Sequence, residues 1–530
     1  MIDRAHNKGC IIYDEMDDES LRDWFDYKQK KFLHNIDTFY YTVKLREDFT
    51  STSEDTRVFQ FKYELSKKKK LVTDGFGRSV QFFVKGMGNL NVLAGSFDMF
   101  YKFQLSLPDS FDIFIAPVVP KSGDCEGFSV TPEILVQIRS RYLWNYGVVG
   151  AFEKSLEWVR KLLRPYNLHI LEINENRCDF CFHTNYFLSP EKFFTNENIY
   201  KLKVSRFRDS SSHSVNKGSE GFDMDFMSFG RRGGNCYLRI YNKTKEVIEM
   251  NYKPFFFDVW YLERVINKYD LFCYQESYKQ RSWAYMDVAR LRWYLDNGSN
   301  EEYLRIAKGF VDNYELHGVV SDDLMAFADL ITPKVNLIVN IEFQVNRRAT
   351  KSYKFIDFYD RSDKAESERV YRFFDNHVLI TEYLTRETFR LVEGDDKNKS
   401  RRDYHPFWER LRSSIHAFVN LRLKRDNEHK LNLEVMKRKF ANSAVSLSFY
   451  NKGENHDKFG SDVLDALSML NDNDIMRANR YKNKRLNFLI PSLRDRPDDP
   501  VLSDLSIVAS DGIVYDRGDF EWFYLVGRSA

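Results

Sequence analysis

The segment CYLRIYNKTKE, residues 236–246, alternates polar and apolar side chains before it ends in a group of charged residues. Successive side chains of a β-strand point to opposite faces of the sheet. Arg239 and Tyr241 are therefore predicted to share one face of a strand, and Leu238 and Ile240 to share the other. The pattern indicates a half-buried strand whose polar face carries a tyrosine beside an arginine.

Tyr241 has three basic residues close to it along the chain, namely Arg239, Lys243 and Lys245. A tyrosine hydroxyl has a reference pKa of about 10, and it is a poor nucleophile unless a cation or a metal stabilises its phenolate. The same cations would neutralise the charged oxygens of a phosphodiester. The alternative is an ordinary sheet tyrosine followed by a solvated basic turn, and these residues alone leave both interpretations open.

A second strand with a polar face is predicted at RCDFCFH, residues 177–183. Asp179, Cys181 and His183 share this face with Arg177. Because an acid and a histidine two pleats apart can reach one divalent ion, the face is a candidate metal site. The alternative is a solvent-exposed strand face that simply carries polar residues.

A third such strand is predicted at KVNLIVNIEFQVNRR, residues 334–348, in which every odd position from 335 to 345 is apolar. Its even face presents Glu342 among amide side chains, including that of Asn340. Glu263 is a second acid of interest, but its neighbours follow a helical pattern and place it on a helix surface. The residues alone do not decide which of the two acids accompanies Tyr241.

The rest of the chain mixes strand patterns with helix patterns, which predicts an α+β fold. A tract of four lysines at 67–70 is expected at a solvated hairpin tip, or as a finger that contacts phosphate. Helices are predicted to dominate beyond residue 367. Further strands are predicted over 36–45, 79–86 and 111–120 and as a pair over 169–187, and helices over 132–163, with a break at 145–150, and over 261–330.

The composition is that of a globular protein, with 43% apolar and 30% charged residues among 530. With 80 basic and 78 acidic residues the net charge is only +2, so affinity for nucleic acid must come from local basic clusters. Such clusters occur at 397–402, 423–430 and 477–485. The aromatic share of 16% leaves the stacking of bases on aromatic side chains open as a further source of affinity.

Cysteine content and hydropathy indicate the compartment. Six cysteines spread over this length form no disulfide framework, which favours a reducing environment. The first twenty residues lack the apolar run of a signal peptide, and no stretch approaches the ~18 apolar residues of a membrane span. The protein is therefore predicted to be soluble and cytoplasmic, without a membrane partner.

Taken in order, several segments resemble the Rep_trans family, which comprises rolling-circle replication initiators of plasmids and phages and related MobT-type relaxases of integrative conjugative elements. The match is most specific at 229–246, FGRRGGNCYLRIYNKTKE, which is similar to the family's tyrosine signature. The looser matches are the opening strand IDTFYYTV (36–43), the R-x-D strand NRCDFCFH (176–183), the acidic strand NIEFQVNRR (340–348) and the closing segment FRLVEGDDKNKSRRDYHPFWERL (389–411).

The resemblance implies a catalytic domain like that of HUH nucleases, with a central antiparallel sheet followed by a mainly helical C-terminal region. It implies Tyr241 as the nucleophile, with Arg239 and Lys243 at the scissile phosphate. The residues that it places at the DNA are Arg177, Arg231, Arg232, Lys245, Arg347, Arg348, Arg401, Arg402 and Trp408.

The resemblance also implies a divalent ion, Mg²⁺ or Mn²⁺, held by Asp179 and Glu342. His183 stands where the family usually has a second Asp, and it is the third expected ligand. Tyr241 and Glu342 lie farther apart along the chain than is usual in the family, so a helical insertion at 261–330 is expected. Glu263 lies at a more usual spacing and remains a rival to Glu342.

The predicted organisation is a helical lead-in at 1–35, a catalytic region at 36–415 that contains the insertion, a helical basic region at 416–494 and a tail at 495–530. The implied activity is metal-dependent nicking of a replication origin through a tyrosine, which initiates rolling-circle replication. A conjugative relaxase and a non-catalytic origin-binding protein are the alternatives. The implied partners are single-stranded and duplex origin DNA, with room for a host helicase and for a homodimer.

Overall fold

The computed structural model divides into two compact units, Met1–Arg425 and Asp426–Ala530, which are described separately. The structure describes residues 32–46, 53–117, 132–207, 214–217, 224–357 and 362–415, apart from residues 55, 76, 99, 188 and 252, and the short segments 11–13, 424–425, 440, 443–444, 459–469, 507–508 and 514–515.

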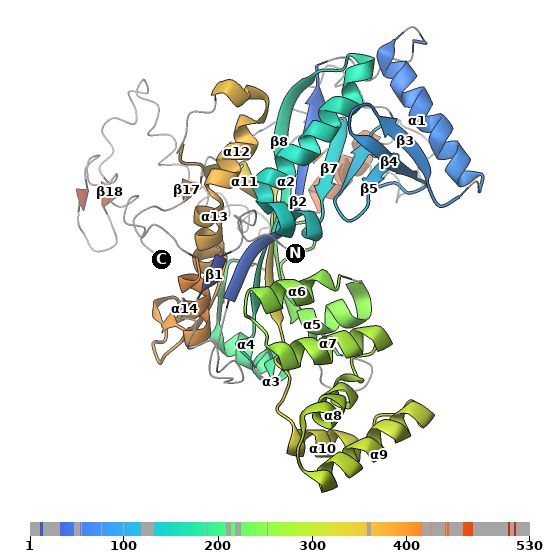
Figure 1. The fold of residues 1–530 in the computed structure, drawn as a ribbon. Coiled ribbons are helices and arrows are strands. Elements are labelled where there is room, and N and C mark those ends of the chain that lie inside the picture. The colour runs from blue at the N-terminus through green and yellow to red at the C-terminus, as the bar shows by residue number, and fades with distance from the viewer. Residues whose placement is uncertain are drawn as a thin grey trace. The chain divides into compact units, whose positions relative to one another are not determined.

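Twelve strands of the described residues form one antiparallel sheet in the first unit (Figure 1). Its order is β10-β11-β12-β13-β8-β2-β7-β6-β5-β4-β3, and β1 also pairs with β2. The fold is therefore α+β with an antiparallel sheet, as the sequence predicts. The strands are β1 (Ile11–Tyr13), β2 (Phe32–Leu45), β3 (Val80–Val84), β4 (Gly88–Leu93), β5 (Phe103–Leu107), β6 (Phe111–Ile115), β7 (Ile134–Ile138), β8 (Ile170–Thr184), β10 (Ser214–Lys217), β11 (Met224–Phe229), β12 (Cys236–Asn242) and β13 (Val339–Asn346).

The two longest strands, β2 and β8, lie side by side at the centre of this sheet. Residues 32–34 of β2 pair with β1 and residues 39–43 pair with β7, on the edge of β2 that faces away from β8. The register between β2 and β8 shifts between Ile36 and Thr38, which leaves Asp37 as the extra residue of a β-bulge. The bulge places an acid at a point that regular alternation does not predict.

Helices cover the apolar face of the sheet and form the main core. Phe39 of β2 packs against Phe152 of α2 (Ser140–Leu163) and against Phe373 and Phe374 of α12 (Glu368–Asp375). Buried aromatic side chains of this size contribute much of the apolar area that stabilises a core. The sheet is thus left with one covered apolar face beneath the polar residues of β8, β12 and β13.

Three local expectations differ from the structure, and a fourth, the break in helix α2, is confirmed. Residues 134–138 form strand β7, because a short apolar run fits a buried strand as well as a helix, and α2 begins only at Ser140. The break expected at 145–150 is present, since Gly147 has a φ of 68° inside α2. The segment 169–187 contains one continuous strand, β8, and the four lysines at 67–70 lie within helix α1 (Arg57–Thr73).

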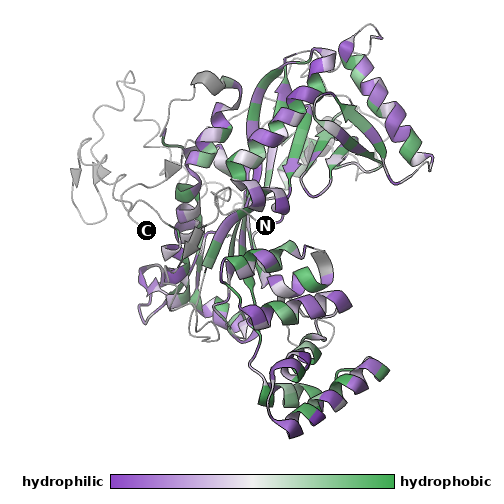
Figure 2. Ribbon diagram, in the orientation of Figure 1, coloured by the Kyte–Doolittle hydropathy of each residue, from purple (hydrophilic) through white to green (hydrophobic). Residues whose placement is uncertain are grey.

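The region 261–330 is helical, as expected, and the helices begin slightly earlier at Phe255. They enclose a second core that includes the buried side chains of Trp260, Tyr269 and Tyr274. Helix α6 is mostly green in Figure 2, whereas α9 alternates green with purple. These helices are α6 (Phe255–Leu262), α7 (Lys268–Gln280), α8 (Met286–Asn297), α9 (Glu301–His317) and α10 (Asp322–Ile331).

The expected helical lead-in falls mostly outside the described residues, but β1 and the early start of β2 at Phe32 show strand within it. Among the described helices, none is long and apolar enough to span a membrane. The remaining elements of the first unit include α3 (Pro190–Phe193), α4 (Asn196–Leu202), β9 (Lys203–Ser205), α5 (Lys243–Lys245), α11 (Arg347–Thr350), β14 (Tyr353–Lys354), α13 (His377–Tyr383), β15 (Phe389–Glu393), β16 (Asp403–Tyr404), α14 (Pro406–Ser413) and β17 (Lys424–Arg425); the second unit contains α16 (Phe459–Ser468), β18 (Ile507–Val508) and β19 (Val514–Tyr515).

Acid is expected to destabilise this fold through His34, which is buried in β2 with neither ring nitrogen hydrogen-bonded to a described residue. Burial, followed by the nearby His377, lowers the pKa of His34 from 6.5 to about 3. Below pH 6.5 the unfolded chain therefore takes up a proton that the folded chain rejects, and stability falls with pH. Relative to wild type, His34→Leu should gain about 2 kcal/mol of unfolding free energy between pH 7 and pH 5. Denaturant unfolding at both pH values measures this gain, and a constant difference between the two proteins would contradict it.

Candidate functional site

The strand register brings the polar residues of β8, β12 and β13 onto one face of the sheet. Arg239 lies opposite Glu342, and Tyr241 lies opposite Asn340. On the next strand, Cys181 and His183 follow in the same rows. Directly opposed residues of antiparallel strands point to the same face, with Cβ atoms about 4.5–5.5 Å apart. Three segments that are distant in the sequence therefore meet around Tyr241.

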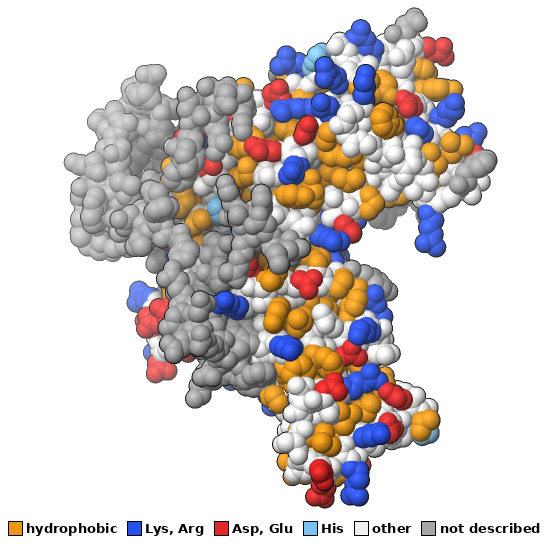
Figure 3. Space-filling view, viewed as in Figure 1, with side chains coloured by type: hydrophobic (Ala, Val, Ile, Leu, Met, Phe, Trp, Pro, Cys, Tyr) orange, Lys and Arg blue, Asp and Glu red, His pale blue; other side chains and the backbone are white. Residues whose placement is uncertain are grey.

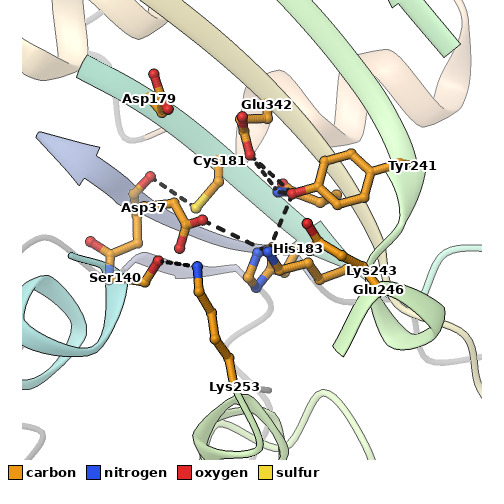
Figure 4. A network of polar contacts seen from close by, with 12 residues as sticks. Asp37, Ser140, Asp179, Cys181, His183, Tyr241, Lys243, Glu246, Lys253 and Glu342 are labelled. Atoms are coloured by element: carbon orange, nitrogen blue, oxygen red, sulfur yellow. Dashed lines mark hydrogen bonds and ion pairs between the residues drawn. The ribbon is translucent and has the colours of Figure 1, made fainter. Parts of the chain in front are cut away.

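The Tyr241 hydroxyl lies at the centre of this group (Figure 4). It donates a hydrogen bond to Oε2 of Glu342 at 3.0 Å. It accepts hydrogen bonds from Nζ of Lys243 at 3.2 Å and from Nδ2 of Asn340 at 2.9 Å. The phenol thus contacts a carboxylate that can take its proton and an ammonium group that can stabilise its anion.

Lys243 is buried although it carries a charge, and two acids surround it. Its Nζ forms an ion pair with Glu246 at 2.6 Å and a longer one with Asp37 at 3.8 Å. Asp37 also accepts a hydrogen bond from Nε1 of Trp144 at 3.2 Å. Asp37 is not predicted from the sequence, and the only signal for it is that it is the single acid of a strand rich in aromatic and β-branched residues.

The charges determine the protonation states at the centre of the site. Burial, and then the negative charges of Glu246 and Glu342, raise the pKa of Tyr241 well above 10, while Lys243 and Arg239 oppose this shift. Burial lowers the pKa of Lys243, but its acidic neighbours outweigh burial and hold the pKa well above 10.5. At neutral pH the tyrosine is therefore a neutral phenol beside a charged lysine, and it needs a base before it can attack.

Asp179 lies on the same face and forms a two-pronged ion pair with Arg177. Nε and Nη2 of Arg177 donate to the two carboxylate oxygens at 2.8 and 2.6 Å. Burial raises the pKa of Asp179 to about 6, Arg177 opposes the shift, and the negative charge of Glu342 adds to it. The other acid, Glu342, forms an ion pair with Arg239. Each of the two expected metal ligands is thus held by its own arginine.

The expectation that His183 binds a metal does not fit its surroundings. Its Nδ1 accepts a hydrogen bond from Nε1 of Trp260 at 3.0 Å, which places the ring proton on Nε2 and leaves no free lone pair for a metal. Trp144 stacks on its ring at 5.3 Å between centroids, and Phe256 packs against it at 5.2 Å. Burial, and then Lys243, lower the pKa of His183 to about 3, so it is a neutral core histidine.

The site as arranged does not fit a divalent ion. No three His, Cys, Asp or Glu side chains of the described residues are placed to hold a metal. Asp179 and Glu342 would have to leave Arg177 and Arg239 before they could share one. The positive charge at Tyr241 is supplied in this arrangement by Arg239 and Lys243.

The structure also places the rival acid. Glu263 is buried at the C-terminal end of α6, and not on the sheet. Glu342 is the acid that accepts the hydrogen bond of Tyr241. Helices α6 to α10 lie between Tyr241 and Glu342 along the chain, and after them the chain returns to the sheet as β13, next to β12.

The residues expected at DNA differ widely in exposure. Arg231, Arg232, Arg348 and Arg401 are exposed, while Arg177, Lys245 and Arg402 are partly buried. On the face seen in Figure 3, basic and acidic side chains are interspersed. The basic clusters at 423–430 and 477–485 lie outside the described residues, apart from the backbone of 424–425.

Trp408 and Arg347 do not fit the expected contact with DNA. Trp408 is buried in the main core, and its Nε1 donates to the carbonyl oxygen of Thr385 at 2.8 Å, so its ring is not available to a base. Arg347 donates to a carboxylate oxygen of buried Glu175 at 3.2 Å, beside Arg369, which also binds Glu175. These two residues therefore support the fold.

Arg347→Ala is expected to lower the unfolding free energy by about 1–3 kcal/mol, because it removes a charged hydrogen bond from the buried carboxylate of Glu175. Arg348, the next residue, is exposed, and Arg348→Ala should change stability by less than about 0.5 kcal/mol. Chemical denaturation of both variants tests the difference. Equal stability of the two variants would show that the Glu175 contact contributes nothing.

Comparisons with known proteins give little further information. No family model matches the sequence, and no curated protein matches it significantly. A solved structure of the rolling-circle replication initiator protein from Geobacillus stearothermophilus aligns with 72% of this chain and 96% of that chain, at 12% sequence identity and a TM-score of 0.30. A likeness this slight assigns neither fold nor function, so the functional argument rests on the residues themselves.

Proposed function

We propose that this protein nicks and rejoins one strand of DNA at an origin through a covalent bond to Tyr241, and that the nick starts rolling-circle replication. The observation that carries the proposal is the hydroxyl of Tyr241, which contacts a carboxylate and an ammonium group at the same time. The resemblance of residues 229–246 to the tyrosine signature of replication initiators supports the same chemistry.

In the first step Glu342 acts as the general base. Its Oε2 takes the proton of the Tyr241 hydroxyl across the 3.0 Å hydrogen bond as the phenolic oxygen attacks the phosphorus. The new bond joins phosphorus to the tyrosine oxygen, and the bond from phosphorus to the 3′-oxygen breaks. The 3′-oxygen leaves with the bonding electrons and takes a proton from water. The products are a 5′-phosphotyrosine and a free 3′-hydroxyl.

Two cations stabilise the charge that develops on the phosphate and on the phenolate. Lys243 already contacts the phenolic oxygen, and Arg239 lies over the Tyr241 ring at 5.2 Å and remains partly exposed. An incoming phosphate competes with Glu342 for the Arg239 guanidinium, which releases the carboxylate to act as a base. Fixed cations of this kind are usually the largest contribution to such catalysis.

Asp37 acts as a positioning residue in this scheme. Its carboxylate and that of Glu246 hold the Lys243 ammonium group charged and next to the phenol. Opposing charges keep the pKa of Asp37 below its usual range despite burial, with Lys243 and Lys253 as the main causes. A buried charge cluster costs stability unless it is fully paired. A protein that only binds an origin gains nothing from such a cluster beneath a tyrosine, which favours catalysis over binding alone.

The experiment is incubation with single-stranded origin DNA in a buffer that contains Mg²⁺, followed by denaturing electrophoresis. A label on the 3′ side of the nick should migrate with the protein, because the tyrosine holds the 5′-phosphate. A label on the 5′ side should appear in a free strand that a polymerase can extend. A protein-bound label on the 5′ side, or no adduct with the cognate origin, would refute the proposed reaction.

A further inference from the structure

A cleft of about 740 Å³ lies where the N-terminal end of α2 meets α6 and α7. Basic residues line it from both sides: Arg139 and Arg141 at the start of α2, Lys253 just before α6, and Lys279 within α7. Its lining also includes aromatic residues, among them Phe255 and Tyr278, which are partly exposed. Cations together with accessible aromatic rings are the features with which proteins bind unpaired nucleotides.

Arg139 is held by the buried carboxylate of Asp112 at 2.7 Å, but two other cations of the cleft, Arg141 and Lys279, are exposed to a ligand. Four basic residues of the lining face two acids, Asp109 and Asp258. Arg141 binds Asp109 at 3.1 Å, but both side chains are exposed, at 54% and 69%. Lys279, which is 67% exposed, pairs with Glu276. An ion pair that is exposed on both sides contributes only about 0–1 kcal/mol, so a phosphate can replace Asp109 at Arg141 at little cost.

The floor of the cleft borders the Tyr241 site. Nζ of Lys253 donates to Oγ of Ser140 at 3.0 Å, and both residues line the cleft. Ser140 hydrogen-bonds to Asp37, whose other neighbour is Lys243 beneath Tyr241. Figure 4 shows Lys253 and Ser140 on the side of Asp37 away from Tyr241.

A second route connects the cleft with the exposed side of the site. Burial raises the pKa of Tyr40 to about 12, and the positive charges of Arg177 and Arg139 both oppose this shift. The Arg177 guanidinium lies over the Tyr40 ring at 5.3 Å. Arg177 binds Asp179, which lies on the sheet face that also carries Arg239. Basic and aromatic side chains therefore continue from the cleft to the residues around Tyr241.

We propose that this cleft binds the unpaired nucleotides next to the phosphate that Tyr241 attacks. The inference rests on the proposed function and adds the path that the single strand takes past α2, α6 and α7. The cleft lies within the range of small-ligand sites, about 300–1,000 Å³, which suits nucleotides taken up singly. On this proposal, the helical insertion helps to hold DNA.

The test measures binding of a fluorescent oligothymidylate, which has no nick site, to the full-length protein by anisotropy over a range of salt concentrations. Arg141→Glu and Lys279→Glu reverse one exposed cation on each side of the cleft. Lys308→Glu is the matched control, because Lys308 is exposed on α9 of the same insertion but lines a different groove.

Each phosphate contact on a single strand contributes about 0.7 to the slope of log K against log salt. Each cleft reversal should therefore flatten the slope by at least that amount and weaken binding about fivefold at 0.1 M salt, whereas Lys308→Glu should match wild type. If the cleft variants bind like the control, the inference is wrong. If they lose affinity and wild type still forms no adduct with origin DNA, the nicking function fails and strand binding by the cleft is supported.

Discussion

Tyr241→Phe is expected to abolish the covalent protein–DNA adduct and to leave binding of the uncut strand unchanged. The substitution removes the only oxygen that attacks the phosphorus in the proposed reaction. It also removes one of the acceptors of Lys243 and Asn340, while Glu246 and Glu342 still accept from them, so the unfolding free energy should fall by only about 1 kcal/mol. Adduct formation, strand affinity and thermal unfolding are measured side by side.

Tyr237→Phe is the matched control, because Tyr237 lies two residues earlier on the same face of β12. It should form the adduct at the rate of wild type. An adduct that persists in Tyr241→Phe, or its equal loss in Tyr237→Phe, would remove Tyr241 from the role of nucleophile.

Lys243→Met is expected to slow adduct formation by about 10²–10³-fold. This magnitude is typical when one preorganised electrostatic partner of a transition state is removed. Without the lysine, the pKa of Tyr241 rises further and the phenolate loses its nearest cation. Lys245→Met, two residues along the chain and partly exposed, should retain most of the activity. Single-turnover kinetics on origin DNA measure both variants.

Lys243→Met also leaves Asp37 and Glu246 without their cation, and an unpaired buried charge can destabilise a protein by about 3–5 kcal/mol. The double variant Asp37→Asn/Lys243→Met removes one of these charges and should recover part of the stability without recovering the rate. Recovery of the rate in the double variant, or a normal rate in Lys243→Met, would show that the lysine only supports the fold.

The period of two along β-strands is what made the core of the candidate site predictable. Alternation alone placed Arg239 with Tyr241 on one face and Glu342 on the matching face of another strand. The order of strands in the sheet then set the three side chains beside one another, since β12 and β13 are neighbours. That order depends on long-range pairing and cannot be predicted from any local sequence pattern.

Asp37, His183 and Trp408 show what local patterns miss. Asp37 reaches Lys243 from a β-bulge, and a bulge depends on how β2 pairs with β8. His183 has the spacing of a ligand, but Trp144 and Trp260 enclose it, and both come from helices distant in the sequence. Trp408 is likewise covered by packing that only the tertiary fold creates. In each case the long-range pairing and packing of the fold, and not the residue type, decide the role.

The most direct test of the central claim is to identify the amino acid that is linked to DNA. Trypsin cleaves after Arg239 and Lys243, so residues 240–243 form a peptide with Tyr241 as its only tyrosine. After nuclease and trypsin digestion of the adduct, mass spectrometry should find a nucleotide 5′-phosphate on this peptide, attached to Tyr241. Attachment to any other residue would contradict the account.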